Sequence, residues 1–126
     1  MKEELARYNC CIDAAMSVIE GRWKGTIICM LAMNGPLRFS ELQKNIGEVT
    51  SRILTKQLKE LEEDGMVMRT VQSEGKIKVY YSLTQRGNSV IPVLRMLAEW
   101  GRDQMVQVIV PTVSETQEIS EAEAAD

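Results

Sequence analysis

The sequence predicts an α+β domain that is mostly α. Two short helices joined by a tight turn precede a two-stranded hairpin and a long C-terminal helix. Apolar residues recur at helical spacing before residue 64 and after residue 84, whereas the segment between them alternates as extended strands do. Gly and Pro mark the breaks between these segments. At 126 residues the chain can bury one core. We expect one domain over residues 1–110 and an acidic, disordered tail over 111–126.

Two helices are expected before the turn. Residues 11–20 carry Ile12, Met16 and Ile19 at spacings of four and three, and Gly21 interrupts this stripe. The run WKGTIICMLAM, residues 23–33, is apolar almost all round and ends in Asn-Gly-Pro, a strong stop signal. This second helix should therefore lie at the centre of the core.

A helix-turn-helix follows. Residues 37–39 are too short for more than a bridge strand, and Ser40 is expected to cap the helix ELQKNI. After the four-residue break at 47–50, Thr50 should cap a helix over 51–63, whose leucines follow the i, i+4, i+7 rule. Two helices joined by a short turn that contains Gly make a helix-turn-helix.

A β-hairpin is predicted next, over residues 66–83. The runs MVMRTVQ and IKVYYSL are rich in β-branched, aromatic and alternating residues, and SEGK between them should form the tip. A hairpin directly after the second helix of a helix-turn-helix is a wing, so the fold expected is a winged helix-turn-helix.

Thr84 should cap a long helical segment that continues to about Val110 and that Pro92 bends near its start. This segment carries an apolar seam that so small a domain cannot cover by itself. The seam consists of Val90, Val93, Leu94, Leu97 and Trp100.

The charges of the helix at 51–63 oppose its own dipole, because the basic residues come first and the acidic residues last. An advance of 100° per residue gathers its basic and hydroxyl side chains on one arc, opposite the leucines. Such side chains reach phosphates and base edges in a major groove. An ordinary solvated face has the same composition, but the helix-turn-helix and the wing favour DNA. The DNA-binding residues expected are Ser51, Arg52, Thr55, Lys56 and Lys59, with Arg38 before the motif and Lys76 and Lys78 on the wing.

Composition excludes several other classes of protein. The net charge is −3, but residues 111–126 hold five acidic and no basic residues, so the rest of the chain is mildly basic. With no apolar run long enough for a membrane span and no secretion signal, we expect a cytoplasmic protein. The chain has no His and no glycine-rich phosphate loop, so we expect no metal, no cofactor and no enzyme. A thiol oxidoreductase is the one enzyme that the residues could build.

The sequence resembles the HxlR family of winged-helix regulators, relatives of the MarR-type proteins. The resemblance runs from Cys10 through the segment LRFSELQKNIGEVTSRILTKQLKELEEDGMVMR to YSLTQRGNSVIPVLRMLAEWG, which ends at Gly101. It implies a homodimer, formed by the N-terminal and long C-terminal helices, that presents two recognition helices to a palindromic DNA operator. In such a dimer the apolar seam of the C-terminal segment is the dimerisation surface, because the second copy covers what one copy cannot. It also implies control of transcription, often of genes that handle electrophiles or oxidants.

Different roles are expected for the three cysteines. Cys10 stands where several members of the family have a redox-active thiol, and the start of a helix favours the reactive thiolate. The alternative is that Cys10 is a small packing residue. Cys11 could act as a resolving partner, and Cys29 is expected to pack in the core.

Two functions therefore stay open from the sequence. The first is a DNA-binding regulator, switched by oxidation or electrophile modification at Cys10 or by a small-molecule effector. The second is a winged-helix module that binds an acidic protein instead of specific DNA. Neither the operator, the regulated genes, the inducing signal nor the sign of control follows from the residues.

Overall fold

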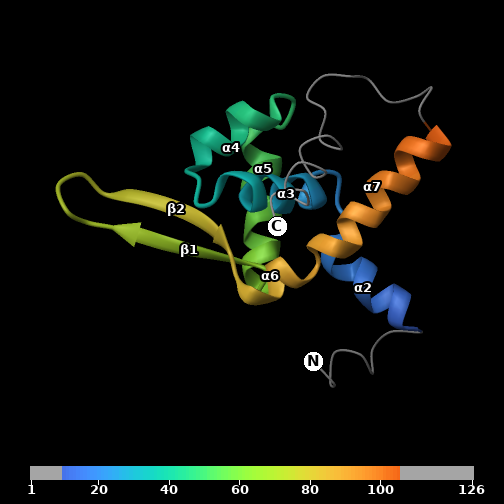
Figure 1. Ribbon diagram of the computed structural model, residues 1–126. Coiled ribbons are helices and arrows are strands. Elements are labelled where there is room, and N and C mark those ends of the chain that lie inside the picture. The colour runs from blue at the N-terminus through green and yellow to red at the C-terminus, as the bar shows by residue number, and fades with distance from the viewer. Residues whose placement is uncertain (1–9, 106–126) are drawn as a thin grey trace.

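The computed structural model describes residues 10–105, which form six helices and one antiparallel hairpin (Figure 1). The expected acidic tail lies outside these residues. The helices α3, α4 and α5 pack around the core, while the hairpin projects away from them and α2 and α7 lie on the opposite side. None of the helices in this described part has the length and the hydropathy to cross a membrane. The winged helix-turn-helix predicted from the sequence is confirmed, with the following bounds: α2 Cys11–Ile19, α3 Lys24–Asn34, α4 Phe39–Ile46, α5 Ser51–Glu63, β1 Val67–Gln72, β2 Lys78–Leu83, α6 Gln85–Ser89 and α7 Ile91–Met105.

The core forms around α3, as its all-round apolar pattern predicts. Ile27 and Ile28 are fully buried, and so are the leucines that α4 and α5 turn toward them. Each fully buried side chain of this size stabilises the fold by about 1.5–3 kcal/mol. These residues hold the helix-turn-helix against α3. The leucines are Leu42, Leu54, Leu58 and Leu61.

The start of α4 differs from the prediction. The helix begins at Phe39, so Arg38 and not Ser40 occupies the N-cap position. Arg has no acceptor for the free N–H groups of the first turn. Glu41 reaches back, and its Oε1 accepts the backbone N–H of Arg38 at 2.9 Å. The acidic half of a capping box thus replaces the expected serine cap.

The hairpin has an uninterrupted register from Val67 opposite Leu83 to Gln72 opposite Lys78. Its tip covers residues 73–77, one residue more than expected. The predicted bridge strand is also confirmed. The N–H of Leu37 donates to the carbonyl of Tyr81 at 2.9 Å, and the N–H of Tyr81 donates back at 2.7 Å. The hairpin is thereby tied to the segment that leads into α4.

The C-terminal segment is two helices instead of one bent helix. Thr84 caps α6 as expected, because its Oγ1 accepts the N–H of Gly87 at 3.0 Å. The chain leaves the helix at Val90, and Pro92 lies in the first turn of α7. Proline has no N–H to donate to the carbonyl four residues earlier, but the first turn of a helix does not require that bond. Pro92 therefore starts α7 and does not bend a continuous helix.

Candidate nucleic-acid interface

The turn of the helix-turn-helix is fixed by hydrogen bonds of side chains. Thr50 caps α5 as predicted, since its Oγ1 accepts the N–H of Ile53 at 3.2 Å. Across the turn, Nε2 of Gln43 donates to Oγ of Ser51 at 2.9 Å, and Val49 inserts into the core with 5% exposure. These contacts determine the angle between α4 and α5, and the hydroxyl of Ser51 is already engaged within the motif.

The outer face of α5 is open to solvent. Its leucines are at most 1% exposed, whereas all the residues predicted to contact DNA on this helix are exposed. The hydroxyl of Thr55 donates to the carbonyl of Ser51 at 2.7 Å, which leaves the methyl group and both oxygen lone pairs of Thr55 for an external contact. The helix thus presents one continuous polar and basic arc, made of Ser51, Arg52, Thr55, Lys56 and Lys59.

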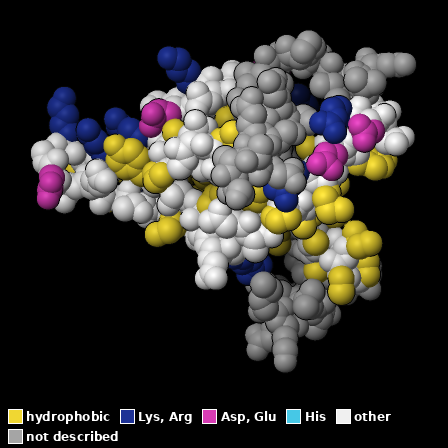
Figure 2. Space-filling view, in the orientation of Figure 1, with side chains coloured by type: hydrophobic (Ala, Val, Ile, Leu, Met, Phe, Trp, Pro, Cys, Tyr) yellow, Lys and Arg dark blue, Asp and Glu magenta, His cyan; other side chains and the backbone are white. Residues whose placement is uncertain are grey.

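The remaining predicted DNA contacts come from two other elements. Arg38 is exposed at the start of α4, and Lys76 and Lys78 are exposed where the tip of the hairpin meets β2. Lys and Arg side chains gather along the projecting hairpin in Figure 2. Arg69 on β1 is a further exposed cation of this hairpin that the sequence reasoning missed. The sequence feature that could have identified Arg69 is a basic residue at one of the alternating positions of a predicted strand.

Two polar contacts behind α5 were also missed. Gln57 is 9% exposed, and its Oε1 accepts the backbone N–H of Trp23 at 2.9 Å. Lys24, 4% exposed, forms an ion pair with Glu60, with 3.6 Å between Nζ and Oε1. Both contacts join the helix α5 to the start of α3. They restrict how α5 can rotate about its own axis, and so determine which of its side chains face outward.

The two N-terminal thiols are exposed, and Cys10 occupies the N-cap of α2. Its Sγ accepts the N–H of Asp13 at 3.5 Å. Cys29 is partly buried and packs against the core, in line with the packing role expected for it. Within residues 10–105, no three acidic, cysteine or histidine side chains come together in a way that could hold a metal ion.

The predicted dimerisation seam divides in the structure. Leu94 is 8% exposed and belongs to the core, and Val90 is partly buried against it. Val93, Leu97 and Trp100 are 50%, 49% and 61% exposed. The sequence reasoning missed one member of this outer face, Met96, which is 69% exposed. On α2, Ile12 and Met16 are exposed as well, and Figure 2 shows hydrophobic side chains gathered over that helix.

Comparison with known proteins decides the family. The model of the HxlR-like helix-turn-helix family matches residues 18–108, which includes the helix-turn-helix, the hairpin and α7. The chain belongs to the HxlR-like helix-turn-helix family. The resemblance stated from the sequence is therefore confirmed, and the chain is a regulator of the helix-turn-helix type.

Three HxlR-like or structurally similar proteins are informative. An uncharacterised helix-turn-helix transcriptional regulator of Methanothermobacter thermautotrophicus is 44% identical over 95 residues, which are 75% of this chain and 72% of the relative. The redox regulator HypR in its oxidised form is 38% identical with a TM-score of 0.69, over 75% of this chain and 97% of HypR. The reduced form of the transcriptional regulator YodB from Bacillus subtilis is 31% identical with a TM-score of 0.67, over 78% of this chain and 96% of YodB.

Proposed function

We propose that this HxlR-like chain is a homodimeric regulator that binds a palindromic DNA operator. The observation that carries the proposal is the outer arc of α5, where exposed basic and hydroxyl side chains lie opposite a buried leucine face. An α-helix with such a face fits the major groove, where Arg and Lys read guanine and contact phosphates. The acids that close α5, from Glu60 to Asp64, lie beyond this arc toward the end of the helix.

The hairpin supports the same proposal. It projects from the body beside the helix-turn-helix and carries exposed cations at Arg69, Lys76 and Lys78, with Glu74 as the one acidic residue. Cations on a projecting hairpin can neutralise phosphates next to the groove that α5 enters. Arg38 follows Leu37, which pairs with Tyr81 of β2, so it adds a further exposed cation near the base of the hairpin.

A second copy of the chain would cover the exposed apolar side chains of α2 and α7. Large exposed apolar faces are rare on soluble monomers, and they mark surfaces of association. A twofold dimer would place two copies of α5 about 34 Å apart, one turn of DNA, so that both enter successive major grooves. The palindromic operator follows from this symmetry.

We further propose that modification of Cys10 or Cys11 changes DNA binding. Both thiols are exposed and therefore open to oxidants and electrophiles. Because Cys10 caps α2, a bulky or charged adduct on its sulfur would disturb the contact in which this sulfur accepts the N–H of Asp13. The likeness to HypR, described as a redox regulator, supports this regulation.

The experiment for the proposed function is a binding titration on DNA selected from the region around the protein's own gene. The expected result is a preference for one palindrome over random DNA, with an affinity that falls linearly with salt on a logarithmic scale. The absence of DNA binding at low salt would contradict the proposal. It would favour the alternative function, a module that binds an acidic protein.

A further inference from the structure

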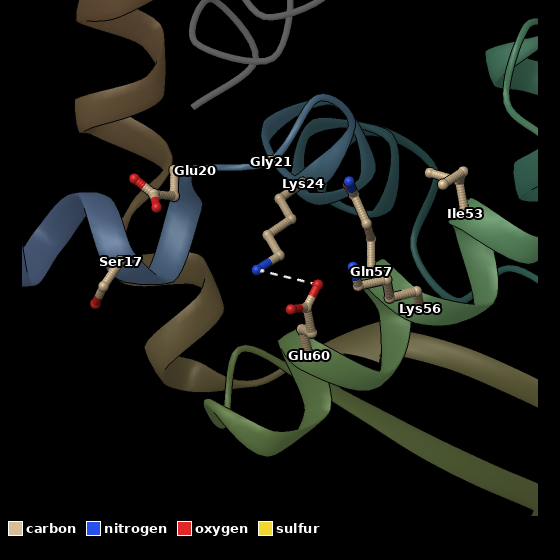
Figure 3. A pocket seen from close by; sticks show the side chains of 8 residues that line it. All are labelled: Ser17, Glu20, Gly21, Lys24, Ile53, Lys56, Gln57 and Glu60. Atoms are coloured by element: carbon tan, nitrogen blue, oxygen red, sulfur yellow. Dashed lines mark ion pairs between the residues drawn. The ribbon is translucent and has the colours of Figure 1, made fainter.

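A pocket of about 420 Å³ lies behind the recognition helix, within a single copy of the chain. It is bounded by the end of α2, by the link to α3 and by the inner edge of α5 (Figure 3). The proposed DNA contacts do not use this pocket, apart from Lys56 at its edge. Its lining residues are Ser17, Glu20, Gly21, Lys24, Ile53, Lys56, Gln57 and Glu60.

Lys24 is the unusual residue of this pocket. It is 4% exposed, and the contact found for its ammonium group within residues 10–105 is the carboxylate of Glu60 at 3.6 Å, a distance beyond a hydrogen bond. No buried side-chain nitrogen or oxygen of these residues lacks a hydrogen-bond partner, so the ammonium group, which has three donors, borders the open space of the pocket. The side chain of Glu60 is 42% exposed, so this carboxylate can turn out to water. Lys24 is therefore buried but only loosely paired.

The surroundings add further donors for an anion. The Oε1 of Gln57 is used by Trp23, whereas its amide Nε2 lies beside Gly21, within 3.3 Å of the position that a Cβ on Gly21 would take. Helix α3 begins at this point without a side-chain cap, so the positive end of its dipole is open. Lys56 supplies a second ammonium group at the edge of the pocket.

We propose that this pocket binds a small anion, whose carboxylate or phosphate group competes with Glu60 for Lys24. Glu60 is the carboxylate that the chain itself supplies, and its long distance and exposure make it replaceable. The volume suits a small metabolite. Glu20, on the α2 side, opposes a ligand of high negative charge. A charge-assisted hydrogen bond between ligand and Lys24 would replace a pair that is too long for one.

Occupation of the pocket has a consequence for α5. The Lys24–Glu60 pair and the Trp23–Gln57 hydrogen bond are the two polar contacts described between α5 and the start of α3. An anion that displaces Glu60 removes one of them and leaves the other. The ligand would thus loosen the end of α5 that follows the DNA-facing arc. This regulation rests on the proposed function, whereas anion binding itself does not.

The test is a nuclear magnetic resonance titration of the full chain without DNA. The signals followed are the backbone N–H of Trp23 and the side-chain amide of Gln57. Malonate and inorganic phosphate are the two probes, and sodium chloride at matched ionic strength is the control. We expect saturable shifts of both signals with malonate, with phosphate or with both, and the probe that acts identifies the chemical source. Unsaturated shifts equal to those in chloride would overturn the proposal.

Three variants make the test specific. Lys24→Met should weaken binding of the active probe about tenfold or more, because it removes the central cation. Glu60→Gln should strengthen binding several-fold, since it removes the internal competitor, while Glu63→Gln, outside the pocket, should leave the affinity unchanged. Equal affinities in Glu60→Gln and Glu63→Gln would contradict the competition. This comparison stands even if Lys24→Met fails to fold.

Discussion

The side-chain carbonyl of Gln57 accepts the backbone N–H of Trp23 at 2.9 Å, although the two residues are 34 positions apart. This bond connects the middle of α5 to the residue that precedes α3. Gln57 lies between the buried leucines and the open pocket. The bond therefore restrains how far α5 can turn about its own axis, while the buried leucines hold the helix in place. The orientation of α5 therefore depends on an amide that lies on the side of the helix opposite the arc proposed to bind DNA.

Replacement of Gln57 should remove the hydrogen bond between α5 and Trp23. We expect Gln57→Met to lower the free energy of unfolding by about 1–2 kcal/mol, since the N–H of Trp23 loses its acceptor in a partly buried place. Gln57→Glu keeps an acceptor and should lose less. Urea unfolding measures both effects. Equal stability of Gln57→Met and the wild type would show that the bond contributes nothing to the fold.

The DNA-facing arc predicts the effects of two surface variants. Arg52→Ala and Lys56→Ala should each weaken operator binding by about 1–3 kcal/mol, and loss of a phosphate contact should reduce the salt slope by about 1. Sedimentation should show unchanged assembly. Arg102→Ala on α7 is the matched control, because it removes a cation far along the chain from the motif. If Arg52→Ala and Lys56→Ala bind the operator like the wild type, α5 is not the recognition helix.

Thiol regulation predicts a loss of response. Cys10→Ser should abolish the change in DNA binding that diamide causes, because serine keeps an acceptor at the N-cap but cannot be oxidised in this way. Gel shifts with reduced and diamide-treated protein measure the response. Cys29→Ser should respond like the wild type. A full response in Cys10→Ser would indicate that the sensing thiol is Cys11 or Cys29 instead.

Two neighbouring leucines of α7 should behave in opposite ways. Leu94→Ala removes a core side chain, so we expect a loss of about 2–5 kcal/mol in unfolding free energy. Leu97→Ala truncates a side chain that is 49% exposed, so it should mainly weaken association of two copies. Chemical unfolding and analytical ultracentrifugation distinguish the two effects. An unchanged association constant in Leu97→Ala would remove α7 from the proposed dimer interface.

Gly87 in α6 should tolerate no side chain. A Cβ at this position would lie 2.1 Å from the carbonyl oxygen of Met66, so we expect Gly87→Ala to destabilise the fold by about 3 kcal/mol or more. Gly25→Ala is the matched helical control, because its Cβ would meet Leu94 at an ordinary 3.7 Å. The melting temperatures of the two variants provide the comparison. Similar values would show that α6 can move away from Met66 with little loss of stability.

Local patterns predicted most of the fold. The helices follow from apolar spacing, and the caps Thr50 and Thr84 were predicted because their hydroxyl groups act within a few residues of the chain. The error at Ser40 is also local, since Glu41 can satisfy the same helix start from inside the first turn. Pro92 was placed in the correct segment, but periodicity alone could not distinguish a bent helix from two helices.

The contacts behind α5 could not be predicted in this way. Lys24 and Glu60 are both residue types that usually lie on the surface, and nothing in their local sequence indicates that they meet. The same limit applies to Leu94. It belongs to the apolar stripe of α7 as Leu97 does, and only the packing of α3 against α7 decides that Leu94 is covered within one chain. The outer arc of α5 was predictable, because the helical periodicity of this one segment assigns both its buried face and its exposed face.

The bridge between Leu37 and Tyr81 makes the base of the hairpin move with the helix-turn-helix, while residues 71–78 stay exposed and touch no other element through buried side chains. The base of the hairpin is therefore joined to the helix-turn-helix, whereas its tip is held by the hairpin's own pairing. If DNA is bound as proposed, substitution of the base pairs that α5 contacts should abolish or strongly weaken binding. Base pairs under the hairpin tip should vary among operators. Differences in the width of the flanking groove should be accommodated by shifts of the hairpin tip.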